Sequence, residues 1–301
     1  MPGEIASENE KLPIACFLVI NHIPDLPAIS ISSALINSNL DILIGFINEE
    51  DLRNLPKSPR IKYLDLRAEA ISLNLLSEDQ EYKSFADDSF FKLVQLKWVL
   101  FTKVLDANPA KNLIYSDIDV FWIKDASVPI IESFKQWSDL DILIQDATGS
   151  PNHLALCMGF VAFRNSTKSR EIITTCSKKH AELLKATPRV GDDDIITDYY
   201  KRMGRPANIQ LLPQSTFPVG KFLNAFTSKS LFPGLKPEVP FIFHSNFVVG
   251  SKKKLLITLI LFQNLKLKMP SGLPFVTLGK SRIEILARRI LIPIRSRLQS
   301  K

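Results

Sequence analysis

Short apolar runs alternate with longer segments of helical periodicity along most of the chain. The segments 23–39, 89–108 and 169–187, and another from about residue 195, carry apolar residues at the spacing of amphipathic helices. Strands that alternate with helices form βαβ units and a largely parallel sheet. The sequence therefore predicts an α/β domain. The apolar runs that we interpret as its strands are residues 14–20, 41–47, 61–66, 112–116, 139–146, 156–164, 209–213 and 240–246.

The composition is that of an ordinary globular protein, because 46% of the 301 residues are hydrophobic and 23% are charged. The three cysteines have unrelated spacings, which indicates neither a disulfide framework nor a zinc site and fits a reducing compartment. The first twenty residues carry acids where a secretory signal would carry basic residues. The apolar run 255–262 is too short to span a bilayer. We expect a cytoplasmic protein, or one that is peripheral on the inner face of a membrane.

The positive charge is concentrated at the end of the chain. Residues 251–301 hold twelve Lys or Arg and one acid, a net +11 within a total of +7, so residues 1–250 carry −4. This asymmetry divides the chain into a body, 1–250, and a basic amphipathic extension, 251–301. The extension is interpreted as a solvated surface helix or as a contact with anionic lipid. We expect no nucleic-acid partner, because stacking aromatics are scarce there.

Two Asp-x-Asp patterns differ in their position relative to the apolar runs. Asp117 and Asp119 follow one run, whereas Asp139 and Asp141 precede the next. Ligands of open α/β sheets bind at the carboxyl ends of the strands. The first pair is therefore the candidate site, and the second is expected to be a solvated turn.

The pair Asp117 and Asp119 alternates with aliphatic residues, so both carboxylates can point to one side of a strand. Two like charges that close are unfavourable unless a cation or hydrogen-bond donors compensate them. A hard divalent ion, Mg²⁺ or Mn²⁺, suits such oxygen ligands. The alternative is a polar strand end with two solvated carboxylates.

The stretch "YSDIDVFWIKD", after a lysine-bearing helix and a short "NPAKN" loop, resembles the metal-binding motif of GT-A-fold glycosyltransferases. More closely, it is similar to the nucleotide-diphospho-sugar transferase family. The resemblance covers most of residues 14–254, and it implies a GT-A-like, Rossmann-type mixed sheet flanked by helices. The further elements that support it are Lys97 in "QLKWVLF", Gly159-Phe160 in "LCMGFVAFRNST", Asp193-Asp194 in "GDDDIITD", and "FHSNFVVGSKKK", which contains His244, Gly250 and Lys253.

The resemblance implies a metal-dependent, retaining glycosyltransferase. Its donor would be a nucleoside-diphosphate sugar, and its acceptor a glycan, a lipid-linked molecule or a protein. Cys157 stands where the family usually has Asn, and Asp194 where it usually has Gln. The implied roles are metal binding for Asp117, Asp119 and His244, catalysis at the sugar for Asp193 and Asp194, and donor binding for Asn21, Lys97, Asp117, Gly250 and Lys253.

Other interpretations stay open. A histidine at a strand end, as His244 is expected to be, is often only a hydrogen-bonded structural residue, and the Asp192–Asp194 triplet can be a helix cap. The rival functions are a metal-dependent phosphatase with an Asp nucleophile and a non-catalytic, basic-tailed membrane-binding protein. The remaining histidines (His22, His153, His180) are expected to be structural or on the surface, and Trp98, Phe121 and Trp122 to lie in the core.

Overall fold

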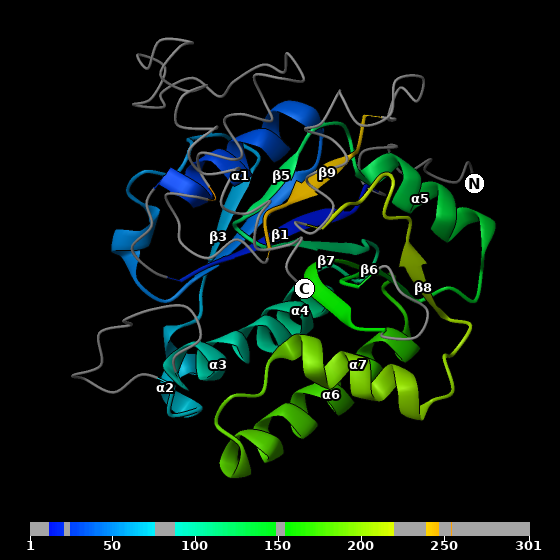
Figure 1. Ribbon diagram of the computed structural model, residues 1–301. Coiled ribbons are helices and arrows are strands. Elements are labelled where there is room, and N and C mark those ends of the chain that lie inside the picture. Colours follow the sequence, from blue (N-terminus) through cyan, green and yellow to red (C-terminus); the bar gives the residue numbers. More distant parts are fainter. Residues whose placement is uncertain are drawn as a thin grey trace, which may run out of the picture.

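The computed structural model describes residues 12–20, 25–75, 88–148, 154–219, 239–246 and 254. Its centre is a seven-stranded sheet in the order β3-β2-β1-β4-β7-β6-β8 (Figure 1). Every neighbouring pair is parallel except those that β7 makes with β4 and β6. The predicted mixed α/β sheet is thus confirmed. Its strands are β1 (Ile14–Val19), β2 (Asp41–Phe46), β3 (Ile61–Asp65), β4 (Leu113–Ser116), β6 (Ile142–Asp146), β7 (Leu156–Phe163) and β8 (Ile209–Leu212).

Helices cover both faces of the sheet. One face carries α1 (Asp25–Asn37), α5 (Ser127–Gln136) and a small antiparallel sheet made of β5 (Val120–Trp122) and β9 (Ile242–His244). A 3₁₀ turn, η2 (Glu49–Leu52), follows β2. Figure 1 shows the remaining helices on the opposite side. These are α2 (Arg67–Ser72), α3 (Asp88–Val94), α4 (Leu96–Ala107), α6 (Thr167–Ala186) and α7 (Asp192–Arg202).

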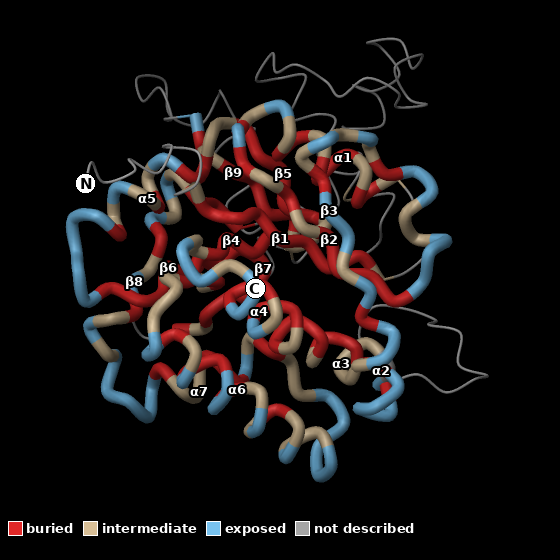
Figure 2. The backbone as a smooth tube through the Cα atoms, turned by 180° about the vertical axis from the view of Figure 1, so that it is seen from behind, coloured by how far each residue is buried: buried red, intermediate tan, exposed pale blue. Residues whose placement is uncertain are grey.

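The two faces of the sheet bury separate hydrophobic clusters, because successive side chains of a strand point to opposite sides. In β1, Cys16 packs into the cluster beneath α4 and α6, whereas Phe17 packs into the cluster beneath α1. All six residues of β1 are buried, as expected for a central strand covered on both faces (Figure 2). Trp98, Phe121 and Trp122 are buried in the core, as predicted.

The structure differs from the sequence-based expectation at several helices and strands. The helix predicted over 89–108 is two helices, because the backbone turns tightly at Gln95, where Gln95 N–H donates to Lys92 O and Trp98 N–H to Gln95 O. The helix expected from about residue 195 begins at Asp192. Neither α5 nor the pairing of β5 with β9 was predicted.

The second Asp-x-Asp pattern is only partly solvated, which corrects the expectation of a solvated turn. Asp139 is exposed, but Asp141 is buried. Its carboxylate accepts hydrogen bonds from Ser166 Oγ (2.5 Å) and Asn208 Nδ2 (2.7 Å). Asp141 therefore ties the start of β6 to the segments before α6 and β8, which is a structural role.

The described helices include none with the length and apolar composition needed to cross a bilayer. Of the basic extension, the described residues contain Lys254 alone. The predicted lipid contact and the division of the chain at residue 250 therefore stay predictions.

Candidate active site

The site lies at the carboxyl end of the central strand β4. Asp117 directly follows β4, and its N–H donates to Gly159 O of β7 at 2.7 Å, which continues the strand pairing by one residue. Because β7 runs antiparallel to β4 and β6, its first half lies beside their carboxyl ends. Near the end of β6, Gln145 pairs with Cys157 of β7. Three strands thus bring polar groups to one place.

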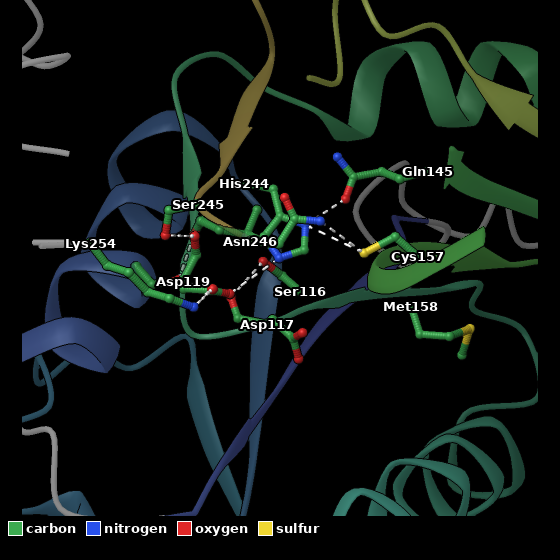
Figure 3. Close-up of polar contacts among 12 residues, drawn as sticks. Ser116, Asp117, Asp119, Gln145, Cys157, Met158, His244, Ser245, Asn246 and Lys254 are labelled. Atoms are coloured by element: carbon green, nitrogen blue, oxygen red, sulfur yellow. Dashed lines mark hydrogen bonds and ion pairs between the residues drawn. The ribbon is translucent and has the colours of Figure 1, made fainter. Parts of the chain in front are cut away.

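His244 reaches this site from a distant part of the chain. In the small sheet, β9 pairs with β5 so that His244 lies opposite Val120, the residue after Asp119. Ser245 holds this register, since its N–H and its hydroxyl both donate to Asp119 O, at 3.0 and 3.1 Å. One ligand atom each of Asp117, Asp119 and His244 then lie within 4.8 Å of one another (Figure 3).

The chemistry of this group suits a divalent cation. It joins two carboxylates to an imidazole, and His244 Nε2 lies 3.3 Å from Asp119 Oδ1. Lys254 Nζ contacts Asp119 Oδ2. Burial by itself would raise the pKa of Asp119, but the interactions of its carboxylate with His244 and Lys254 outweigh burial and lower that pKa below its ordinary value. The carboxylate is thus held ionised, as a metal ligand must be.

Lys97 connects the Asp-x-Asp motif to α7. Its buried Nζ lies 3.0 Å from Asp117 Oδ1 and 2.9 Å from Asp192 Oδ2. It also lies 5.0 Å from the centre of the Tyr115 ring, and the Tyr115 hydroxyl donates to Asp117 Oδ1 at 2.6 Å. Burial would lower the pKa of Lys97, but the charges of Asp117 and Asp192 outweigh it and raise that pKa. The ammonium group of Lys97 therefore holds a positive charge directly beside the Asp117 carboxylate.

Two hydrogen bonds attach the first half of α7 to β7. Met158 N–H donates to Asp193 Oδ1 at 2.6 Å, and Leu156 N–H donates to Thr197 Oγ1 at 2.9 Å. Burial, supported by the charge of Asp192, raises the pKa of Asp193 to about 8. Asp193 is therefore mostly protonated at neutral pH.

Asp194 has different surroundings from Asp193. Its side chain is exposed, and its carboxylate accepts the Gly191 N–H at 3.0 Å, which satisfies the backbone donor at the N-cap of α7. This contact matches the helix-cap interpretation of the acidic triplet. A catalytic role for Asp194 stays a prediction.

The other predicted residues fall into two groups. Asn21, Gly250 and Lys253 lie outside the described residues, as do His22 and His153. His180 is buried in the core, where its Nδ1 accepts from Trp98 Nε1 at 3.0 Å and its Nε2–H donates to Val190 O at 2.9 Å, which is a structural role as expected.

Three residues of the site were missed from the sequence. Asp192 was not separated from its two acidic neighbours, although a buried lysine needs a nearby carboxylate. Tyr115 was interpreted only as part of an apolar run. Nothing in the local sequence of Gln145 indicates that it contacts His244, 99 residues away.

The sequence profile described as nucleotide-diphospho-sugar transferase matches residues 61–257. Among solved structures, mouse xyloside xylosyltransferase 1 in its apo form has a TM-score of 0.53 and 12% identity, covering 78% of this chain and 98% of that one. The galactosyltransferase LgtC, in complex with donor and acceptor sugar analogs, has a TM-score of 0.54 and 12% identity, covering 87% and 97%. At such identity the likeness concerns the fold. No curated protein sequence matches significantly.

Proposed function

This chain belongs to the nucleotide-diphospho-sugar transferase family, and on that premise we propose that it is a metal-dependent glycosyltransferase whose reaction takes place at Asp117, Asp119 and His244. The observation that carries the proposal is that one ligand atom each of Asp117, Asp119 and His244 lie within 4.8 Å of one another, although His244 is more than 120 residues from the two aspartates in the chain. A site built from such distant segments, with ligands suited to a hard divalent ion, has more than a packing role.

The proposed reaction breaks the bond between the anomeric carbon of the sugar and the diphosphate, and it forms a bond from that carbon to a hydroxyl of the acceptor. Mn²⁺ or Mg²⁺, held by Asp117, Asp119 and His244, would supply positive charge to the departing diphosphate. Lys254, which contacts Asp119, would add a second positive charge beside the same leaving group. Lys97 would keep Asp117 oriented, because it pairs with Oδ1 of that carboxylate.

Asp193 is proposed to interact with the transferred sugar. At neutral pH its raised pKa keeps a proton on the carboxyl group, so that it can donate a hydrogen bond to a sugar hydroxyl as well as accept one. By the family resemblance, we propose retention of the anomeric configuration. The departing phosphate would take the proton of the attacking hydroxyl. The expected acceptor is a hydroxyl of a glycan, a lipid-linked molecule or a protein.

Thermal unfolding with Mn²⁺ and a panel of nucleoside diphosphates tests the proposal. We expect the matching nucleotide to raise the Tm only when the ion is also present, since a ligand at 100 times its Kd stabilises by about 2.7 kcal/mol. The variant Asp119→Asn should lose this shift. Asp139→Asn, which alters the exposed aspartate of the other Asp-x-Asp pattern, should keep it.

A screen of nucleotide sugars for slow hydrolysis then identifies the donor. The proposal would be falsified if no nucleotide shifted the Tm, or if Asp119→Asn kept the full shift. Hydrolysis of phosphomonoesters that is lost in Asp117→Asn would instead indicate the phosphatase.

A further inference from the structure

Gln145 is a fully buried polar residue near the end of β6, with its side chain beside His244 (Figure 3). Its amide has partners at both ends. The nitrogen Nε2 lies 3.1 Å from Phe217 O and 3.5 Å from Pro218 O. The oxygen Oε1 lies 2.9 Å from His244 Nδ1. A buried amide with this many contacts has one orientation.

These partners determine which way the amide faces. Backbone carbonyls can only accept hydrogen bonds, so the NH₂ group must point to Phe217 and Pro218. The amide oxygen then faces His244 Nδ1, and because that oxygen can only accept, Nδ1 must carry a hydrogen. The chemistry of two peptide carbonyls thus sets the protonation of an imidazole atom.

The same hydrogen determines what the other ring nitrogen can do. Nε2 faces Asp119 Oδ1 at 3.3 Å. When Nδ1–H is fixed in a neutral ring, Nε2 presents a lone pair to a carboxylate. Two such electron-rich atoms repel each other unless both bind the same cation. Gln145 thereby excludes the other neutral tautomer, in which Nε2–H would donate to Asp119. In that tautomer Nε2 would have no lone pair with which to bind a cation.

The neighbouring Cys157 is the other group close to the ring nitrogen, but it is a poorer partner. Its sulfur lies 3.7 Å from His244 Nδ1 and is itself contacted by Asn246 Nδ2 at 3.5 Å. Sulfur is also the weaker acceptor. The segment 217–218, by contrast, serves both residues, because Pro218 O also accepts from His244 N–H at 3.3 Å.

We propose that Gln145 is a positioning residue, which holds His244 in the Nδ1–H form so that Nε2 is available to the divalent cation. The inference rests on the proposed function, since it assigns a role toward the ion of that site. Hydrogen bonds to the distal nitrogen of a ligating histidine fix its orientation, and their loss weakens metal binding by about tenfold to a hundredfold.

The variant for the test is Gln145→Met, which keeps the length of the side chain and removes both polar ends. The first measurement needs no metal: ¹H–¹⁵N NMR of the His244 ring in the full-length protein. We expect a slowly exchanging Nδ1–H in the wild type and its loss in Gln145→Met. In Gln145→Glu, which keeps an acceptor toward the ring, the signal should persist.

The second measurement is Mn²⁺ affinity by calorimetry in the presence of the nucleotide. Gln145→Met should weaken it about tenfold to a hundredfold, with Gln145→Glu close to the wild type. In a His244→Ala background, Gln145→Met should cost nothing further, because the two residues act as one unit. Gln214→Met is the matched control, since its amide also donates to a carbonyl of β6, Asp146 O at 3.0 Å, and does not serve the ring.

Each outcome decides the matter. A His244 ring that keeps its Nδ1–H in Gln145→Met, or unchanged Mn²⁺ affinity in that variant, overturns the role of Gln145 and leaves the proposed transferase intact. A wild type with the expected Nδ1–H that binds no Mn²⁺ overturns the metal site and the positioning role together. Equal losses in Gln145→Met and Gln214→Met would mean that the effect is general destabilisation, which also overturns the inference.

Discussion

The imidazole ring of His244 occupies the space that a side chain at Gly159 would need. An ideal Cβ placed on Gly159 would lie 2.1 Å from His244 Cε1 and 2.7 Å from Nε2. Gly159 lies in β7, and its backbone is not in the left-handed region, so space and not conformation requires a glycine there. The imidazole therefore packs directly on the backbone of the strand that pairs with β4, which places it beside Asp117.

The first prediction concerns Gly159→Ala. The new methyl group must push the ring away, because a backbone-bound Cβ cannot move far, so Mn²⁺ binding should be lost. Overpacking of this kind costs about 1–3 kcal/mol of unfolding free energy. The measurement is calorimetric Mn²⁺ titration together with urea unfolding. Gly45→Ala in β2 is the control, since the three atoms nearest to its Cβ would be the ends of leucine side chains, at 3.0–3.3 Å. Mn²⁺ binding that survives in Gly159→Ala would contradict this account.

The second prediction concerns Lys97→Met. Removal of the ammonium leaves the carboxylates of Asp117 and Asp192 without their shared positive charge, and breaking a buried pair costs about 3–5 kcal/mol. Urea unfolding at neutral pH should show this loss. Adding Asp192→Asn should recover part of the stability.

The control for this charge is Lys103→Met on the same helix. Lys103 pairs with Glu69 at 2.6 Å, but its side chain is 41% exposed, so its loss should cost less than about 1 kcal/mol. Equal effects at Lys97 and Lys103 would show that the buried pairing contributes no special stability.

The third prediction is a pH dependence that arises from Asp193. Its pKa in the folded protein is raised to about 8, whereas the ordinary value of an Asp is about 3.9. Between these values the unfolded chain releases the proton and the folded protein keeps it, so this residue's contribution to stability falls as pH rises from about 4 to 8. Asp193→Asn keeps an acceptor for Met158 N–H and cannot ionise. Its unfolding free energy, relative to the wild type, should therefore increase over that range.

The matched variant for this measurement is Thr197→Val. It removes the other hydrogen bond between α7 and β7, from Leu156 N–H, without removing a titratable group. Its destabilisation should be the same at every pH. A difference between Asp193→Asn and the wild type that does not change with pH would sink the assignment of the raised pKa.

How far the sequence could predict the site depends on which contacts are local. Asp117 and Asp119 could be placed because an apolar run ends just before them, and a strand's carboxyl end is where ligands bind. His244 was placed by resemblance, and its approach depends on the pairing of β5 with β9. Each of these strands has three residues, too few for an alternating pattern to be visible. No periodicity could have predicted that pairing.

The contacts of Gln145 and Lys97 could not be predicted from local sequence patterns either, because their partners are far away in the chain. The partner of Gln145 is 99 residues away, and that of Lys97 on α7 is 95 residues away. Such pairs follow from the tertiary arrangement, in which β9, the strand of His244, pairs with β5, and α7 is hydrogen-bonded to β7. The apolar spacing continues through Gln95, so it predicts one helix where the structure has α3 and α4.

The last prediction concerns Lys254, whose Nζ contacts Asp119 Oδ2, one of the atoms available to the cation. For Mn²⁺ alone, the ammonium and the ion compete for Asp119, so Lys254→Met should tighten binding by about fivefold, the equivalent of about 1 kcal/mol. For Mn²⁺ together with the matching nucleoside diphosphate the sign should reverse, because the lysine then faces an added anion and its removal weakens binding. Calorimetric titrations with and without the nucleotide measure both effects. Lys124→Met is the control, since that ammonium lies over the Phe241 ring, 5.4 Å from its centre. If Lys254→Met changed both affinities in the same direction, Lys254 would not be exchanging Asp119 for the diphosphate.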